Sequence, residues 1–208
     1  DTHYGRVLEM TVKGDIVKTW GKPGKGPAEF THPLACTVDA ESEVAYVVEY
    51  GAYNDRVQKF VSATGAFVAH TSPGDVVRPW GCVYWDGKLY VSSEIWPHCI
   101  SIFDATTLVL LSTFGGFPAH NQPRGMATDG THLYICDNGN NRITKYTLAG
   151  GLVSVMTGGV GVGDGQFNGM SACSVDGRYL LVTDYGNKRV QQFLPSDLSF
   201  VSSIPTQV

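Results

Sequence analysis

The chain has 208 residues, 43% of them apolar and only 16% charged, which excludes a disordered chain and allows a sizeable buried core. Its formal net charge of -4 argues against a domain that binds nucleic acid by neutralising phosphates alone, because such domains are usually basic overall or on one face. No run of 18 apolar residues is present, so no membrane-spanning helix is predicted. The 25 glycines and 10 prolines are typical of an all-β protein with many turns.

The first segment, residues 1–22, predicts only the outer half of a four-stranded sheet. Its two strands run from Arg6 to Val12 and from Ile16 to Trp20, with a turn at 13–15. A sheet without its inner pair leaves strand edges open, and such edges pair readily with other chains. We therefore expect either that the chain is a piece of a longer repeat protein, which we prefer, or that copies complete one another as a homo-oligomer or filament.

Two glycine-rich loops, residues 21–30 and 158–167, have the same pattern and each ends in phenylalanine. A phosphate-binding Walker loop needs Gly-Lys followed by Ser or Thr at the start of a helix. Both loops lead into a strand pattern instead, so we interpret them as crossovers between sheets.

Four longer segments each predict four short strands, at 31–74, 76–115, 121–158 and 168–205. Asp-Gly pairs at 86–87, 129–130 and 176–177 lie between alternating apolar runs, which is a strong hairpin signal. The closing aromatic residues recur about every 43 to 47 positions, a spacing typical of propeller blades; they are Phe60, Phe103, Tyr146 and Phe193. The sequence predicts one all-β domain, a β-propeller of about four full blades and a half blade at the N-terminus, left incomplete or completed in trans.

An acid that ends the second strand is matched by an arginine that opens the third strand in three of the repeats. The pairs are Glu49 with Arg56, Asp137 with Arg142, and Asp184 with Arg189. The remaining repeat has Ser93 and Cys99 at these positions, so both partners are lost together. This is expected of a structural ion pair, because an orphaned buried charge is costly.

The five cysteines form no C-x-x-C pair and no disulfide-framework spacing. Alignment of the repeats places Cys36, Cys82, Met126 and Cys173 at one equivalent position. That column predicts a small, buried apolar slot in every sheet.

The whole pattern resembles the NHL repeat: a glycine-rich loop ending in Phe, an inner strand ending in Val-Asp, and a later Asn-x-Arg-Val-Gln-x-Phe segment. The best matches are 163–193, 123–146 and 24–60, and the resemblance covers nearly the whole chain. It implies a β-propeller, commonly one of six blades.

Recognition is expected where the blades differ, because shared residues hold the scaffold and loops carry binding. In the divergent repeat, residues 94–98 (Glu-Ile-Trp-Pro-His) replace the turn used by the others. Arginines and aromatic residues on one face suit a peptide, a glycan or a small anion. The candidate binding residues are Tyr53, Arg78, Trp80, Trp96, His98 and Arg124.

An extracellular propeller lyase or hydrolase is the alternative function. Peptidylamidoglycolate lyase is a similar propeller whose family has zinc-binding histidines just after the prolines that open its inner strands, where this chain has Leu34, Trp80 and Arg124. The six histidines show no ligand spacing, and residues 137–141 lack the acid of a calcium loop, so we expect no metal or cofactor.

Single-stranded RNA binding, which some NHL propellers perform, is a lesser alternative that the acidic composition disfavours. We therefore predict a non-catalytic scaffold that binds a protein or peptide partner or assembles with other copies of the chain. The sequence does not establish the compartment, although an extracellular location is favoured over a cytoplasmic one.

Overall fold

The computed structural model describes residues 1–51 and 54–206 and confirms the predicted fold class. The protein is an all-β propeller with four antiparallel sheets of four strands each, in which every sheet contains four strands that are consecutive in sequence. By their internal contacts the residues form two compact units: unit 1 comprises Asp1–Val91 with Ser101–Ser112, and unit 2 comprises Ser92–Ile100 with Thr113–Val208. No helix in the described ranges is long and apolar enough to cross a membrane.

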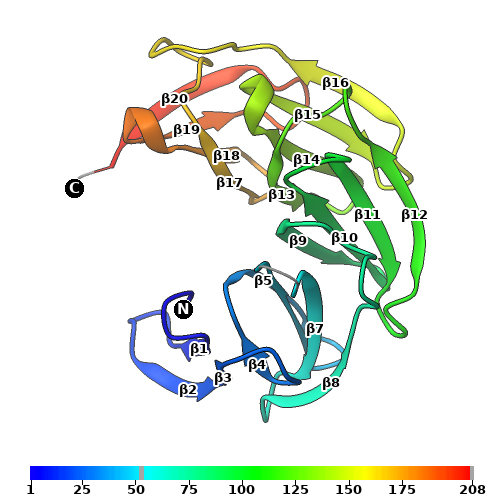
Figure 1. Ribbon diagram of the computed structural model, residues 1–208. Coiled ribbons are helices and arrows are strands. Elements are labelled where there is room, and N and C mark those ends of the chain that lie inside the picture. Colours follow the sequence, from blue (N-terminus) through cyan, green and yellow to red (C-terminus); the bar gives the residue numbers. More distant parts are fainter. Residues whose placement is uncertain (52–53, 207–208) are drawn as a thin grey trace. The chain divides into compact units, whose positions relative to one another are not determined.

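Unit 1 begins with the half blade and contains one complete four-stranded sheet (Figure 1). The half blade is the antiparallel pair β1 (Val7–Met10) and β2 (Ile16–Trp20). The first glycine-rich loop forms the short parallel pair β3 (Lys22–Pro23) and β4 (Glu29–Phe30). The complete sheet consists of β5 (Pro33–Asp39), β6 (Val44–Glu49), β7 (Arg56–Val61) and β8 (Ala66–His70).

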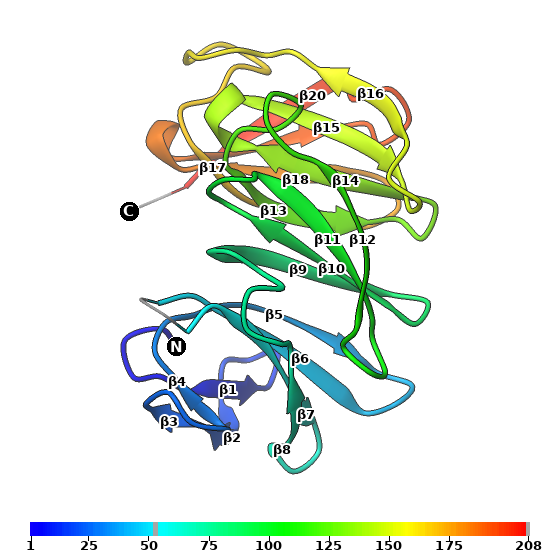
Figure 2. The same cartoon turned by 45° about the vertical axis from the view of Figure 1, so that its right-hand side comes forward.

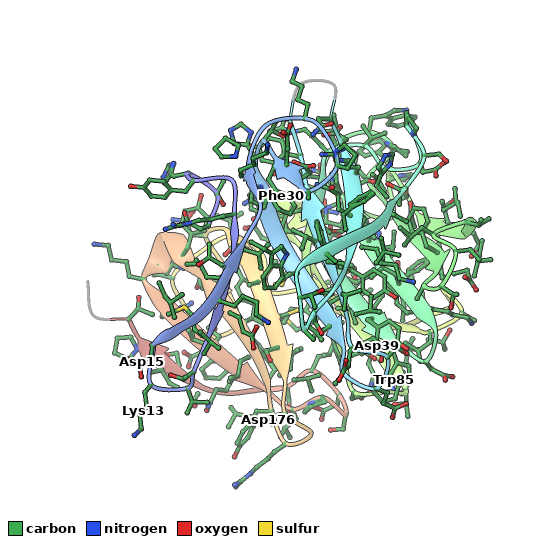
Figure 3. The ribbon with its side chains drawn as sticks, turned by 90° about the horizontal axis from the view of Figure 1, so that it is seen from below. Lys13, Asp15, Phe30, Asp39, Trp85 and Asp176 are labelled. Atoms are coloured by element: carbon green, nitrogen blue, oxygen red, sulfur yellow. The ribbon has the colours of Figure 1, made fainter. Side chains whose placement is uncertain are left out.

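The strand tips of unit 1 lie at the end opposite the glycine-rich loop. Figure 3 shows Lys13 and Asp15 at the β1–β2 turn, and Asp39 and Trp85 at two further hairpin turns, all away from Phe30. The loops before the inner strands and the loops that follow the second strands therefore share the other end of each sheet.

The division between the units passes through three strands of the next sheet. This sheet contains β9 (Pro79–Trp85), β10 (Lys88–Ser93), β11 (Cys99–Asp104) and β12 (Leu110–Gly115).

Unit 2 contains two complete sheets, which Figure 2 shows together with the loops that precede them. The first consists of β13 (Pro123–Thr128), β14 (His132–Asp137), β15 (Arg142–Thr147) and β16 (Leu152–Met156). The second consists of β17 (Met170–Val175), β18 (Leu180–Asp184), β19 (Arg189–Phe193) and β20 (Phe200–Pro205). Single 3-10 turns, η1 (Asn138–Asn140) and η2 (Tyr185–Asn187), follow the second strand of each.

The pairing of strands follows the same pattern in three of the sheets, because equivalent residues of the repeat occupy equivalent strand positions. In three sheets the first strand is irregular just after it begins, between Pro33 and Ala35, Pro123 and Met126, and Met170 and Cys173. The acid that ends the second strand stands opposite the arginine that opens the third in each of these sheets. Repetition in the sequence thus becomes repetition in the strand pairing.

The closing aromatic residues form the core together with the phenylalanines of the glycine-rich loops. Phe60 and Phe193 are 0% exposed, and Phe30 and Phe167 are 1% and 0% exposed. The ring centroids of Phe30 and Phe60 are 5.6 Å apart, and those of Phe167 and Phe193 are 5.9 Å apart. Each such ring stabilises the fold by about 1.5–3 kcal/mol through burial alone. The loops are therefore crossovers, as predicted, and each also inserts a ring into the core.

The cysteine column departs from its prediction at one position. Cys82 and Met126 are buried and Cys173 is partly buried, but Cys36 is exposed. Cys36 lies on β5, which faces the two-stranded sheet β1–β2, and a half blade does not cover it. The prediction of a buried slot in every sheet was therefore wrong for the sheet that follows the incomplete one.

Candidate functional site

The three predicted acid and arginine pairs are present as ion pairs with nearly the same geometry. Arginine Nε donates to the carboxylate at 2.5 Å in Arg56–Glu49, 2.7 Å in Arg142–Asp137 and 2.8 Å in Arg189–Asp184. All three carboxylates are 0% exposed. A buried carboxylate needs several donors.

The remaining donors come from the loop that leads into the same sheet and from the repeat motif itself. In the last sheet, Asp184 also accepts from the Asn168 backbone N–H at 2.8 Å, Asn187 Nδ2 at 2.9 Å and Gln191 Nε2 at 3.1 Å. Arg189 Nη2 in turn donates to the carbonyl oxygens of residues 163 and 166. The polar residues of the motif therefore fasten the glycine-rich loop to the sheet. We call this acid and arginine arrangement the pin.

The first sheet of unit 2 keeps the pin but replaces the aromatic residue of its loop. His120 takes the place that Phe30 and Phe167 hold in the other loops, and it is 0% exposed with its ring 5.3 Å from that of Tyr146. Its Nε2 lies 3.3 Å from Thr144 Oγ1, at the position where two other sheets have glutamine. Burial lowers the pKa of His120 to about 4, with the charge of Asp137 opposing the shift and that of Arg142 adding to it. This histidine is neutral at neutral pH.

The divergent sheet has a pin of its own, which sequence reasoning missed. Glu94 Oε1 accepts from Arg124 Nε at 3.0 Å and from Arg124 Nη2 at 2.7 Å, and the two side chains are 8% and 17% exposed. The acid has moved one residue beyond Ser93, and its arginine comes from β13 and not from β11. The one signal in the sequence was the acid directly after Ser93. Arg124 is thus engaged by a carboxylate, and its role in binding stays a prediction.

We expect this ion pair to be energetically coupled. Glu94→Gln and Arg124→Met each lower the free energy of unfolding by about 2 kcal/mol, because each leaves a charged partner with reduced access to water. The double variant loses less than the sum of the two. Urea unfolding of the four proteins measures the coupling, and additive losses would contradict the pairing.

Next to this pair, two loops of unit 2 present exposed aromatic side chains. Trp96 is 70% exposed, Phe117 is 60% exposed and Ile95 is 37% exposed. We call these three residues the aromatic loop patch. The Phe117 N–H donates to the Pro97 carbonyl oxygen at 3.1 Å, which holds the two loops together. Phe117 was not predicted, because the other repeats have no aromatic residue at the same place in their loops.

His98 lies behind the patch as a link between loops. Its Nδ1 is 2.8 Å from the Glu94 carbonyl oxygen and 3.1 Å from the Gln122 backbone N, and its ring centroid is 6.3 Å from that of Phe117. Its neighbour Cys99 begins β11 and is buried, whereas His98 precedes the strand with a φ of 59°. His98 therefore links the loop at residue 94 to the loop at residue 122.

A second group of candidates lies in unit 1. The Arg78 guanidinium carbon is 5.3 Å from the centroid of the Tyr50 ring, and that ring is 5.2 Å from the His32 ring. Trp80 is half-buried at the start of β9. Tyr53 lies outside the described residues. The expectation that these residues share one surface with Trp96 and Arg124 of unit 2 stays a prediction.

Comparisons with known proteins add no family to this picture. No protein-family model matches the chain, and a search of curated proteins gave no match. Within residues 1–51 and 54–206 no group of three or more His, Cys, Asp or Glu residues is arranged to hold a metal ion.

Proposed function

We propose that the chain is an NHL-type propeller that acts as a non-catalytic scaffold and binds a peptide segment of a partner protein at the aromatic loop patch. The observation that carries the proposal is the exposure of Trp96 and Phe117, 70% and 60%, on loops that are joined by a hydrogen bond. Tryptophan is among the residues most enriched at the energetic centres of protein interfaces, and phenylalanine is enriched in interface cores. Contiguous exposed apolar patches mark interaction sites on protein surfaces.

The loops beneath the patch are ordered before any partner binds. The His98 N–H donates to the Ile95 carbonyl oxygen at 2.7 Å, and the His120 N–H donates to the Gly116 carbonyl oxygen at 2.9 Å. A pre-ordered contact surface lowers the entropy cost of association. The charges of Glu94 and Arg124 cancel each other beside the patch. A partner segment with an apolar or aromatic anchor is therefore favoured over a charged one.

The NHL assignment is supported by the repeat pattern and by what its residues do. The Asn, Arg and Gln of the motif all bind the same carboxylate in the sheets ending at residues 70 and 205. The motif therefore has a structural role that accounts for its recurrence. The loops of the repeat that lacks the motif do not have this role and are candidates for binding a partner.

A peptide library tests this function. We expect phage-displayed random peptides selected on the wild-type protein to contain an aromatic or large aliphatic anchor, and Trp96→Ala/Phe117→Ala to weaken their binding at least tenfold. Binding of the selected synthetic peptides is measured by fluorescence anisotropy.

The matched control is Leu111→Ala/Val153→Ala, which removes apolar side chains that are 54% and 47% exposed on outer strands. This variant should bind as the wild type does. If the peptides bound the patch variant as tightly as the wild type, the patch would not be the binding site. The same conclusion would follow if the control variant lost as much binding as the patch variant.

A further inference from the structure

His120 anchors the loop that carries Phe117. Residues 116–122 join β12 to β13 and belong to unit 2 (Figure 2). His120 is 0% exposed, whereas Phe117, three residues before it, is 60% exposed. The imidazole packs against the start of the loop, since a Cβ added at Gly115 would lie 2.2 Å from its Nδ1. The buried ring therefore fixes the exposed one in place.

Hydrogen bonds on either side of the ring complete the attachment of the loop. The Asn121 backbone N–H donates to Asp137 Oδ1 at 2.7 Å, and Arg142 Nη2 donates to the Ala119 carbonyl oxygen at 2.5 Å. Both neighbours of His120 are thus bonded to the pin of the sheet β13–β16. Displacement of the ring would break these contacts together, because they lie on adjacent residues.

The His120 ring has one nitrogen without a partner among the described residues. Nε2 lies 3.3 Å from Thr144 Oγ1, but Nδ1 has no hydrogen-bond partner. A buried polar atom without a partner is rare and costs stability. Phe30 and Phe167 hold the equivalent place in two other loops and fill it without that cost. Packing alone therefore does not account for a histidine, and what the histidine adds is a group that can take up a proton.

The charged groups that face His120 come from the strands β14 and β15. Asp137 on β14 attracts a proton on the ring, but its carboxylate is already bonded to Arg142 and to the Asn121 N–H. Arg142 on β15 repels the proton, and Tyr146 on the same strand is a neutral phenol whose pKa is raised by burial. Neither the loop nor β12 contributes another charged side chain. Within the described residues, a protonated His120 has no acceptor for its Nδ1–H while the loop is closed.

We propose that His120 makes the aromatic loop patch sensitive to acid: a proton on its ring releases residues 116–122 from the sheet, and Phe117 leaves the patch with them. In the released loop both N–H groups of the imidazolium bond to water, which removes the cost of a buried charge without an acceptor. Loops anchored by Phe30 or Phe167 stay attached, because a phenyl ring takes up no proton. The consequence for partner binding rests on the proposed function, whereas the release of the loop does not.

Amide hydrogen exchange, measured by nuclear magnetic resonance and corrected for the intrinsic pH dependence of exchange, follows the release directly. The Asn121 N–H reports on the loop, and the Asn168 N–H is the internal reference, since it donates to Asp184 at 2.8 Å from a loop that Phe167 anchors. The pKa of His120 is lowered to about 4 by burial and returns to about 6.5 in water. The opening constant at Asn121 should therefore rise about twentyfold from pH 7 to pH 5, and that at Asn168 should not.

His120→Phe is the matched variant, because it copies the ring of the equivalent loops. In this variant the protection of Asn121 should change with pH no more than that of Asn168. His120→Gln does not titrate either and provides a second test with a polar side chain. A pH response of Asn121 that persists in either variant would overturn the proposal. Equal responses of Asn121 and Asn168 in the wild type would also overturn it, because they would show opening of the whole unit and not of this loop.

Binding of the selected peptides separates this inference from the proposed function. Their apparent affinity should fall with pH in proportion to the fraction of closed loop that exchange measures, and His120→Phe should abolish the fall. Unchanged affinity at a pH where exchange shows a mostly open loop would overturn the control of binding by His120. If no peptide binds the patch at pH 7, the proposed function fails, whereas the twentyfold opening at Asn121 still supports the release of the loop.

Discussion

Replacing Asp184 with asparagine lowers the free energy of unfolding by about 3–5 kcal/mol, the loss expected when one partner of a buried ion pair is removed. Donors from four residues converge on this carboxylate: Arg189, Asn187, Gln191 and the backbone of Asn168. An amide places its own two N–H groups among them and leaves the arginine charge uncompensated. Guanidinium chloride unfolding, followed by far-ultraviolet circular dichroism, measures the loss.

The half blade provides the matched control for this substitution. Asp1 binds Arg6 with the same spacing, but its side chain is 21% exposed and that of Arg6 is 37% exposed. Solvent-exposed pairs contribute at most about 1 kcal/mol, so Asp1→Asn should cost less than that. Losses of equal size in the two variants would show that burial of the pin is not what makes it structural.

Acidification destabilises the protein through His120. Its pKa is about 4 in the folded protein and about 6.5 in an unfolded chain, so between these values the unfolded chain binds a proton that the folded protein does not. The stability from the neutral ring is fully present above pH 6.5 and is lost as the pH falls toward 4. The loss is about 3 kcal/mol when it is complete.

His120→Gln isolates this contribution, because glutamine is polar but does not titrate. The stability difference between wild type and variant should shrink by about 3 kcal/mol from pH 7 to pH 4, as measured by urea unfolding at each pH. A difference that stays constant across this range would mean that the ring is not held neutral by burial.

Local, repeated signals made most of the fold predictable from the sequence. Strands Arg56–Val61, Ala66–His70 and Ile16–Trp20 have the predicted ends, because apolar alternation and turn residues bracket each of them. The pins were predictable because acid and arginine recur and vanish together. Both signals depend on comparing one repeat with another.

The candidate site was harder to predict because it lies where the repeats stop agreeing. The partner of Glu94 is thirty residues away on another strand, so alignment of the repeats paired Ser93 with Cys99 and hid Arg124. Phe117 lies in a loop whose counterparts have no aromatic residue at the same place. The burial of Cys36 was predicted from its equivalents, but burial depends on what covers a strand, and β1–β2 lacks the strands that would cover it.

The central claim is that the repeat motif builds the same buried pin in three of the four sheets, so that the loops where the repeats diverge are left for partners. Solvent exchange of the arginine Nε–H groups, measured by nuclear magnetic resonance, tests it most directly. Arg56, Arg142 and Arg189 should exchange at least tenfold more slowly than Arg6, and Asp184→Asn should abolish the protection of Arg189 alone. Fast exchange at all four arginines, or protection of Arg6 equal to that of the others, would contradict the claim.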